Sequence, residues 1–85
     1  MQNIDTDSAW FREIIKEYEY LLPFFPEIFP EKEYRILEMR YGLVYGIEHS
    51  RKEIGKMFGV TTQRVTQLEA KAHDRMYRYI TFKDI

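Results

Sequence analysis

The sequence contains no cysteine, and this absence excludes disulfide bonds and metal sites built on thiolates. The two histidines have no second metal ligand at a suitable spacing, so we expect no metal ion and no other cofactor. No nucleophile beside a base, no glycine-rich phosphate loop and no evident pair of catalytic carboxylates stands out either. The chain is therefore expected not to be an enzyme.

Long apolar runs are also absent, and the N-terminus lacks the pattern of a secretion signal, so we expect no membrane span. Nowhere does a strand-like alternation of apolar and polar residues compete with helical spacing. At 85 residues the chain is large enough for one modest hydrophobic core. These properties predict a single all-α domain, residues 1–85, of about four helices.

Prolines are few, and all three lie between residues 23 and 30. Before them, an apolar stripe at helical spacing predicts a helix over about residues 8–22. We interpret residues 23–30 as a break in helical structure, whose three phenylalanines pack on the neighbouring helices. Another helix is expected over residues 31–41, closed by Gly42.

The C-terminal half carries the clearest structural signal. Ser50 and Glu53 have the spacing of a capping box, which predicts the start of a helix over residues 50–58. Gly59 is placed to end this helix in a left-handed turn, and Thr61 can cap a second helix that runs to about residue 80. Glycine is costly inside a helix, so Gly55 indicates a close approach of the second helix. The residues that must be apolar where the two helices cross are Ile54, Phe58, Val60, Val65 and Leu68.

These features predict a helix-turn-helix, which presents the first turns of its second helix to the major groove of DNA. The side chains opposite the apolar stripe would reach the bases: Thr61, Thr62, Gln63, Thr66 and Gln67. Glutamine can pair with adenine, and threonine can contact thymine through its methyl group. The basic residues expected at phosphates are Lys32, Arg40, Arg51, Lys52, Lys56, Arg64 and Lys71, with Arg75 beside them.

Several short strings of this sequence resemble region 4 of the bacterial sigma-70-type transcription initiation factors. In the family's order they are PEKE, LEMRYGL, EIG, GVT, RV and QLEAKA. The resemblance implies a C-terminal helix-turn-helix of winged-helix-like, sigma region 4 type, which reads the upstream promoter hexamer while docked on the flap of the RNA polymerase β subunit. Together with the absence of a signal sequence, it implies a cytoplasmic location in a bacterial cell. The small size of the chain suggests a phage or mobile-element factor, or an excised domain of a longer sigma factor. The initial methionine favours a complete small protein over an excised domain.

The chain departs from this family where the bases would be read. Typical members carry arginine, glutamate and arginine where this chain has Thr62, Gln63 and Thr66, whereas Gln67 is kept. Because arginine is the side chain that reads guanine, recognition of the usual hexamer is in doubt. Lys32 and Arg40 match family positions that approach the DNA backbone.

The net charge of −1 is divided unevenly along the chain. Residues 1–33 carry three basic and eight acidic side chains, whereas residues 34–85 carry ten basic and six acidic ones. The chain therefore divides into an acidic, aromatic segment, residues 1–30, and a helix-turn-helix segment, residues 31–85. The positive excess of the second segment is small, so we expect the isolated protein to bind duplex DNA weakly.

Two alternatives stay open at this point. A protein-interaction module would bind the polymerase flap or another transcription factor without reading DNA, and the low net charge favours it. A homodimeric repressor would set two recognition helices one turn of DNA apart, with the aromatic first helix as its interface. Binding to polymerase and the molecular mass in solution distinguish these alternatives.

Overall fold

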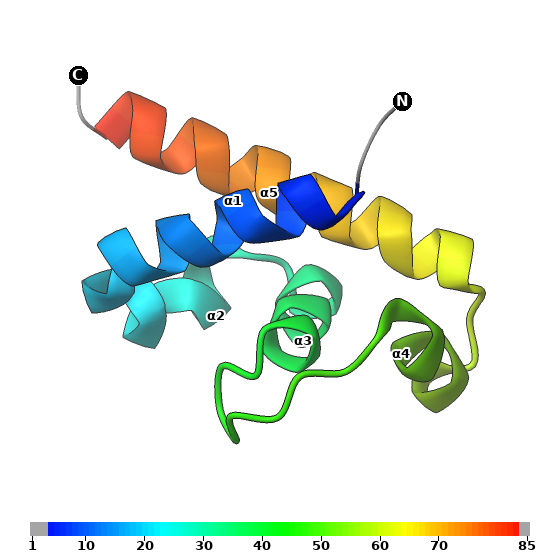
Figure 1. Ribbon diagram of the computed structural model, residues 1–85. Coiled ribbons are helices and arrows are strands. Elements are labelled where there is room, and N and C mark those ends of the chain that lie inside the picture. The colour runs from blue at the N-terminus through cyan, green and yellow to red at the C-terminus, as the bar shows by residue number, and fades with distance from the viewer. Residues whose placement is uncertain (1–3, 84–85) are drawn as a thin grey trace.

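The computed structural model describes residues 4–83, with side chains for residues 8–82. Its elements in chain order are α1 (Ile4–Glu17), the 3-10 helix η1 (Glu19–Phe24), α2 (Phe25–Ile28), α3 (Glu31–Arg40), α4 (Arg51–Phe58) and α5 (Thr62–Lys83). Figure 1 shows α5 spanning the molecule, with α1 crossing in front of it and α3 and α4 beneath. The predicted all-α class is confirmed.

Residues 4–83 contain no strand, so this part of the chain has no wing beside its helix-turn-helix. None of the helices described is long and apolar enough to cross a membrane. The predicted bounds of α3 and α4 are accurate to a residue, and α5 runs three residues further than predicted, to Lys83.

The N-terminal third differs from the prediction. α1 begins at Ile4, four residues before the predicted start, so Ser8 lies inside the helix, where it is buried. Residues 19–28, expected largely as a break, form η1 and α2. Pro23 lies within the short 3-10 helix, and Pro26 lies in the first turn of α2, where a missing N–H group costs little. The expected packing of the phenylalanines holds for two of them, but Phe24 is 52% exposed.

The hydrophobic core has two parts. The larger lies between α1, η1, α2, α3 and α5 and contains Phe11, Ile14, Leu21, Phe25, Phe29, Leu37, Tyr41, Ala72 and Met76. The smaller lies inside the helix-turn-helix and contains Ile36, Ile54, Val65 and Leu68, with Met39 and Phe58 packed against it. The second cluster confirms the predicted crossing except at Val60, whose side chain is 40% exposed at the rim.

Local hydrogen bonds set the two ends of α4. The Ser50 hydroxyl accepts from the Glu53 N–H group, and the Glu53 carboxylate accepts from the Ser50 N–H group, which confirms the capping box. Gly59 ends the helix with φ 69°, a left-handed conformation. A Cβ atom at Gly55 would lie 2.8 Å from the carbonyl oxygen of Val60. The close approach inferred at Gly55 is therefore that of the turn backbone leading into α5.

We expect Gly55→Leu to lower the free energy of unfolding by about 1–3 kcal/mol, because the added side chain forces the turn away from α4. Thermal or urea denaturation followed by circular dichroism measures this. Lys56→Leu is the matched control, since it adds the same side chain at the next position, which is exposed. Equal stability of the two variants would contradict the close approach.

Candidate nucleic-acid interface

The first two turns of α5 present polar side chains to solvent. Thr62, Gln63 and Gln67 are exposed, while Val65 and Leu68 on the other side are buried against α3 and α4. In Figure 1 this end of α5 projects beside α4 and away from α1. Because successive side chains turn about 100° around a helix, Gln63 and Gln67 lie one above the other on the same side.

Two threonine hydroxyls near this face are engaged by the backbone. The Thr61 Oγ1 atom accepts from the Arg64 N–H group at 3.0 Å, so its first role is to cap α5. The Thr66 Oγ1 atom donates to the Thr62 carbonyl at 3.1 Å, and the side chain is half-buried. A base contact by Thr66 would therefore use its methyl group, whereas the two glutamine amides remain available for hydrogen bonding.

Exposed lysines surround this polar face. Lys52 and Lys56 lie on α4, Lys71 lies on α5, and Lys32 lies in the first turn of α3. Arg64 is half-buried and lines a hollow of about 470 Å³ together with Lys32. Arg75 is already paired, since its guanidinium lies 2.9 Å from the Glu33 carboxylate.

Arg40 and Arg51 belong instead to an interior group of polar side chains. We call it the Glu69 cluster; its members are Ser8, Arg40, Tyr41, Arg51, Glu69 and His73. The Nε atoms of Arg51 and Arg40 lie 2.6 and 3.3 Å from Glu69 Oε1. Both guanidinium groups also donate to the Ser8 hydroxyl, at 3.1 and 2.8 Å.

The Glu69 cluster corrects two predictions about phosphate contacts. Arg40 is only 8% exposed and donates to a carboxylate, a hydroxyl and the His49 carbonyl, so it is not presented to DNA. Arg51 has a side chain 16% exposed and is committed to the same carboxylate. The predicted phosphate set is thereby reduced to Lys32, Lys52, Lys56, Arg64 and Lys71.

Hydrogen bonds determine the charge states in this cluster. The Tyr41 hydroxyl donates to Glu69 Oε2 at 2.7 Å and lies 2.9 Å from His73 Nε2. Burial favours the neutral form of Glu69, but the Tyr41 hydrogen bond and the two arginines outweigh burial and hold the pKa of the carboxylate below its ordinary value. Burial and the bond to Glu69 raise the pKa of Tyr41 far above its ordinary value, so this hydroxyl stays neutral.

Sequence reasoning missed the Glu69 cluster. The arginines stand 29 and 18 residues away from Glu69 along the chain, so no local spacing connects them. One signal was present. Glu69 directly follows Leu68 and comes four residues after Val65, which places this carboxylate at the edge of the buried stripe of α5.

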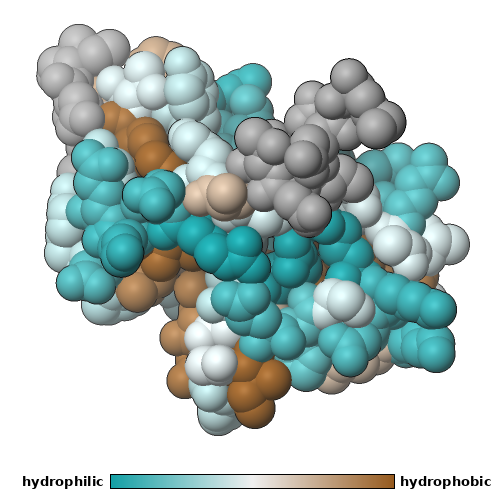
Figure 2. All heavy atoms as spheres, viewed as in Figure 1, coloured by the Kyte–Doolittle hydropathy of each residue, from teal (hydrophilic) through white to brown (hydrophobic). Residues whose placement is uncertain are grey.

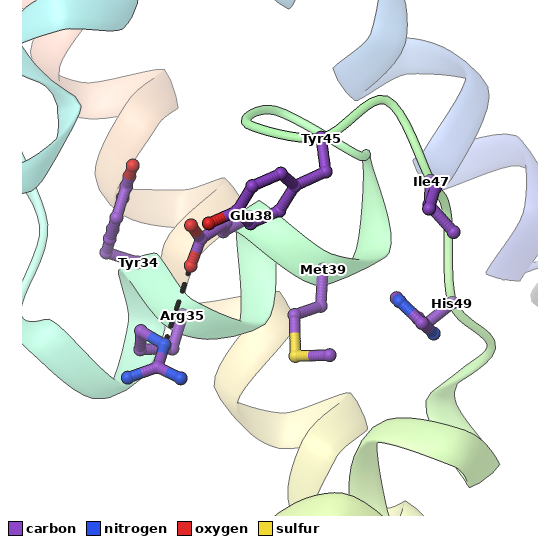
Figure 3. A pocket seen from close by; sticks show the side chains of 7 residues that line it. All are labelled: Tyr34, Arg35, Glu38, Met39, Tyr45, Ile47 and His49. Carbon is purple, nitrogen blue, oxygen red and sulfur yellow. Dashed lines mark ion pairs between the residues drawn. The ribbon is translucent and has the colours of Figure 1, made fainter.

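A second surface feature lies on α3 and the loop that follows it. Figure 3 shows this hollow, of about 480 Å³, lined by Tyr34, Arg35, Glu38, Met39, Tyr45, Ile47 and His49. Two of these lining residues form an ion pair, with the Arg35 Nε atom 3.5 Å from the Glu38 Oε1 atom. Tyr45 is 83% exposed, and Figure 2 shows apolar atoms gathered where this loop projects. Over the described side chains, no group of His, Asp or Glu is arranged to hold a metal ion.

The reduced phosphate set predicts a weak, salt-dependent affinity for DNA. With three to five contacts, the slope of log K against log salt should be about −3 to −4, with micromolar or weaker dissociation constants. Fluorescence anisotropy with a labelled duplex measures this slope. Lys52→Ala with Lys56→Ala should reduce its magnitude by about 2, whereas Arg78→Ala, an exposed change at the other end of α5, should not. An unchanged slope for the double variant would contradict contact by α4.

The crossing of α4 and α5, with an exposed polar face at the start of the second helix, defines a helix-turn-helix domain of the DNA-binding class. Residues 28–78 match the family model "Sigma-70, region 4", which is more than half of the chain. The chain therefore belongs to the sigma-70 region 4 family, whose members are transcription-factor domains and not catalytic ones.

Similarity to a sigma factor covers about half of the chain. The chain is 48% identical over 42 residues to "RNA polymerase sigma factor SigA" of Bacillus sp. The aligned part covers 49% of this chain but only 11% of that factor. No solved structure matches the chain. α1 and η1 precede the residues matched by the family model.

Proposed function

We propose that this protein is a region 4-like transcription factor that acts with RNA polymerase at promoter DNA in the bacterial cytoplasm. It places the first two turns of α5 in the major groove, where Gln63 and Gln67 read base edges. The observation that carries the proposal is the exposure of both amides, on one side of α5, at the start of the second helix of a helix-turn-helix.

The chemistry of this face favours A·T base pairs. Each glutamine can form two hydrogen bonds with an adenine, and the Thr66 methyl group can contact a thymine. No arginine lies at Thr62 or Thr66, the positions from which guanine would be read. The proposed target is therefore an A·T-containing site that differs from the hexamer read by arginine-bearing members of the family.

Docking on polymerase compensates for the small number of phosphate contacts. The Glu69 cluster holds two of the arginines inside the protein, so the isolated chain has little electrostatic hold on DNA. A second contact, to the flap of the polymerase β subunit, would turn the encounter with DNA into an intramolecular step. This supports a factor that works as part of a polymerase complex.

We expect the double substitution Gln63→Ala, Gln67→Ala to remove promoter discrimination while leaving flap binding intact. Each lost bidentate pair is worth about 1–3 kcal/mol of discrimination, and anisotropy competition between promoter and scrambled duplexes measures the loss. Thr81→Ala, an exposed polar change in the last turns of α5, is the control. A double variant with full transcriptional effect would show that base reading is irrelevant.

That outcome would favour the protein-interaction module. The exposed side chains of Val44, Tyr45 and Ile47 on the loop after α3 support this second candidate, because such apolar clusters mark contact surfaces. The homodimeric repressor has less apolar surface to use on α1 than the sequence suggested. Phe11 and Ile14 are buried within the chain's own core, whereas Trp10 is 36% exposed.

A further inference from the structure

We infer that α1 is a reversible internal cover, and that an amphipathic helix of the polymerase competes with it for the same site. The covered site is the apolar side of the helix-turn-helix segment, which we call the α3–α5 face; it consists of Leu37, Tyr41, Ala72 and Met76. The inference rests on the proposed docking on polymerase and concerns how that docking is regulated.

The α3–α5 face lies within the residues that the family model matches, whereas its cover lies before them. All four of its residues lie within the matched range, residues 28–78, whereas α1 and η1 lie outside it. The four residues of the α3–α5 face are 0–7% exposed and belong to a core cluster that also includes Phe11 and Ile14 of α1. Removal of α1 would open this apolar face to solvent. Contiguous apolar surface of this kind marks protein-interaction sites.

α1 is attached to the rest of the molecule by few anchors. Among its described side chains only Ser8, Phe11 and Ile14 are buried. The Phe11 ring stacks on His73 with centroids 4.4 Å apart and lies 5.0 Å from the Tyr41 ring. A buried aromatic anchor with apolar neighbours at helical spacing is the usual mode of a helix bound in a groove.

The remaining attachments of α1 are partly exposed. Ile15 is half-buried against the same core, and Trp10 lies 6.0 Å from the His73 ring. Arg12 forms an ion pair with Glu48 at 2.8 Å, and both side chains are more than two-fifths exposed, so the pair is weak. The Ser8 hydroxyl accepts from Arg40 and Arg51. Release of α1 would leave α4 and its contacts with α5 in place, because none of the described side chains of α1 belongs to the core of the helix-turn-helix.

The residues of α1 define the helix that would replace it. The competitor needs a bulky aromatic residue in the position of Phe11 and an aliphatic residue one turn later, in the position of Ile14. One turn before the aromatic it needs a hydrogen-bond acceptor, because Arg40 and Arg51 both donate to Ser8 there. A carboxylate would meet this need at least as well as a hydroxyl, since it would add an ion pair.

The hollow of Figure 3 is the other surface that a polymerase helix could use. It is already open, but its wall carries the Arg35–Glu38 ion pair. Its most exposed aromatic, Tyr45, lies on the loop and contacts no ring among the described side chains. It offers no enclosed aromatic site comparable to the one that holds Phe11 between Tyr41 and His73.

A cross-link across the Arg12–Glu48 pair tests the cover. The natural chain holds no cysteine, so Arg12→Cys with Glu48→Cys introduces the only two thiols. A bis-maleimide then locks α1 in place, while N-ethylmaleimide modifies the same thiols without joining them. If α1 covers the face about nine-tenths of the time, its release strengthens apparent binding about tenfold. The lock removes the open tenth of the population, so we expect the locked form to lose binding to the isolated flap, whereas the blocked form keeps it.

Two further measurements use the full chain without thiols. Phe11→Ala should bind the flap about tenfold more tightly than wild type, whereas Glu13→Ala, an exposed change on α1, should not differ. Trp10 is the single tryptophan and lies 6.0 Å from the His73 ring. Its emission should shift to longer wavelength when the flap displaces α1.

The outcomes separate this inference from the proposed function. Equal flap binding by the locked and blocked forms, with unchanged Trp10 emission, overturns the cover and leaves the polymerase contact standing. If the double variant Tyr45→Ala, Ile47→Ala loses flap binding and the lock has no effect, docking is assigned to the hollow of Figure 3. This result also overturns the inferred cover. No flap binding by any form overturns the polymerase contact and this inference with it. If Phe11→Ala folds poorly, the comparison of the locked with the blocked protein still decides whether α1 is a reversible cover.

Discussion

Replacing Glu69 by alanine is expected to lower the free energy of unfolding by about 3–5 kcal/mol, because breaking a buried ion pair leaves its partners without a counter-charge. The partners here are Arg40 and Arg51, whose side chains are 10% and 16% exposed. The Tyr41 hydroxyl also loses its acceptor. Urea denaturation followed by circular dichroism measures the change.

Asp74→Ala is the matched control for this prediction. It removes a carboxylate from the same helix, where Asp74 pairs with Arg78 at 3.1 Å and both side chains are mostly exposed. An exposed i,i+4 pair contributes about 0.3–0.5 kcal/mol. If Glu69→Ala cost no more than Asp74→Ala, the Glu69 cluster would contribute nothing to stability and its arginines would be available for other partners.

The same carboxylate predicts a pH dependence. Its folded pKa is below the ordinary value of 4.5, so its stabilising effect is complete above pH 4.5 and is lost as pH falls through the folded value. Wild type should lose stability in this acid range, and Glu69→Gln should lose less. Glu48 also has a lowered pKa, through its pairing with Arg12, so some acid dependence should remain in the variant. If the free energy of unfolding fell equally with pH in wild type and in Glu69→Gln, the role of Glu69 would be contradicted.

The second large effect is expected in DNA affinity. Polymerase-docked protein should bind promoter DNA about 100- to 10,000-fold more tightly than the free chain, because docking supplies a high effective concentration without new DNA contacts. Anisotropy with labelled promoter DNA, with and without core polymerase, measures the gain. The Gln63→Ala, Gln67→Ala variant should lose the promoter-specific part of the gain. Nanomolar binding by the free monomer would contradict the prediction and reveal an unrecognised contact surface.

The cover and the Glu69 cluster are physically connected. Ser8 of α1 accepts hydrogen bonds from the two arginines that hold Glu69, and Phe11 packs against Tyr41 and His73, which also belong to the cluster. Displacement of α1 would remove one acceptor from both arginines at once. A partner helix with its own acceptor at this point would restore it, which gives the exchange chemical specificity beyond apolar fit.

The helix-turn-helix was determined by the sequence alone because its signals are local. The capping box joins residues three positions apart, the Thr61 cap joins Thr61 to Arg64, and Gly59 needs only its own left-handed φ. The polar face of α5 follows from helical periodicity in the same way. Interactions within one turn depend little on the rest of the molecule, so these predictions agree with the structure.

Only the tertiary structure showed that Arg40 and Arg51 are buried, because the sequence alone predicts both as cations on the surface. Their burial requires α1, α3, α4 and α5 to meet around Glu69, and no pattern within one segment encodes that meeting. The exposure of Phe24 and Val60 and the covering of the α3–α5 face by α1 depend on packing for the same reason. Burial is a property of several helices together, whereas capping and periodicity are properties of one.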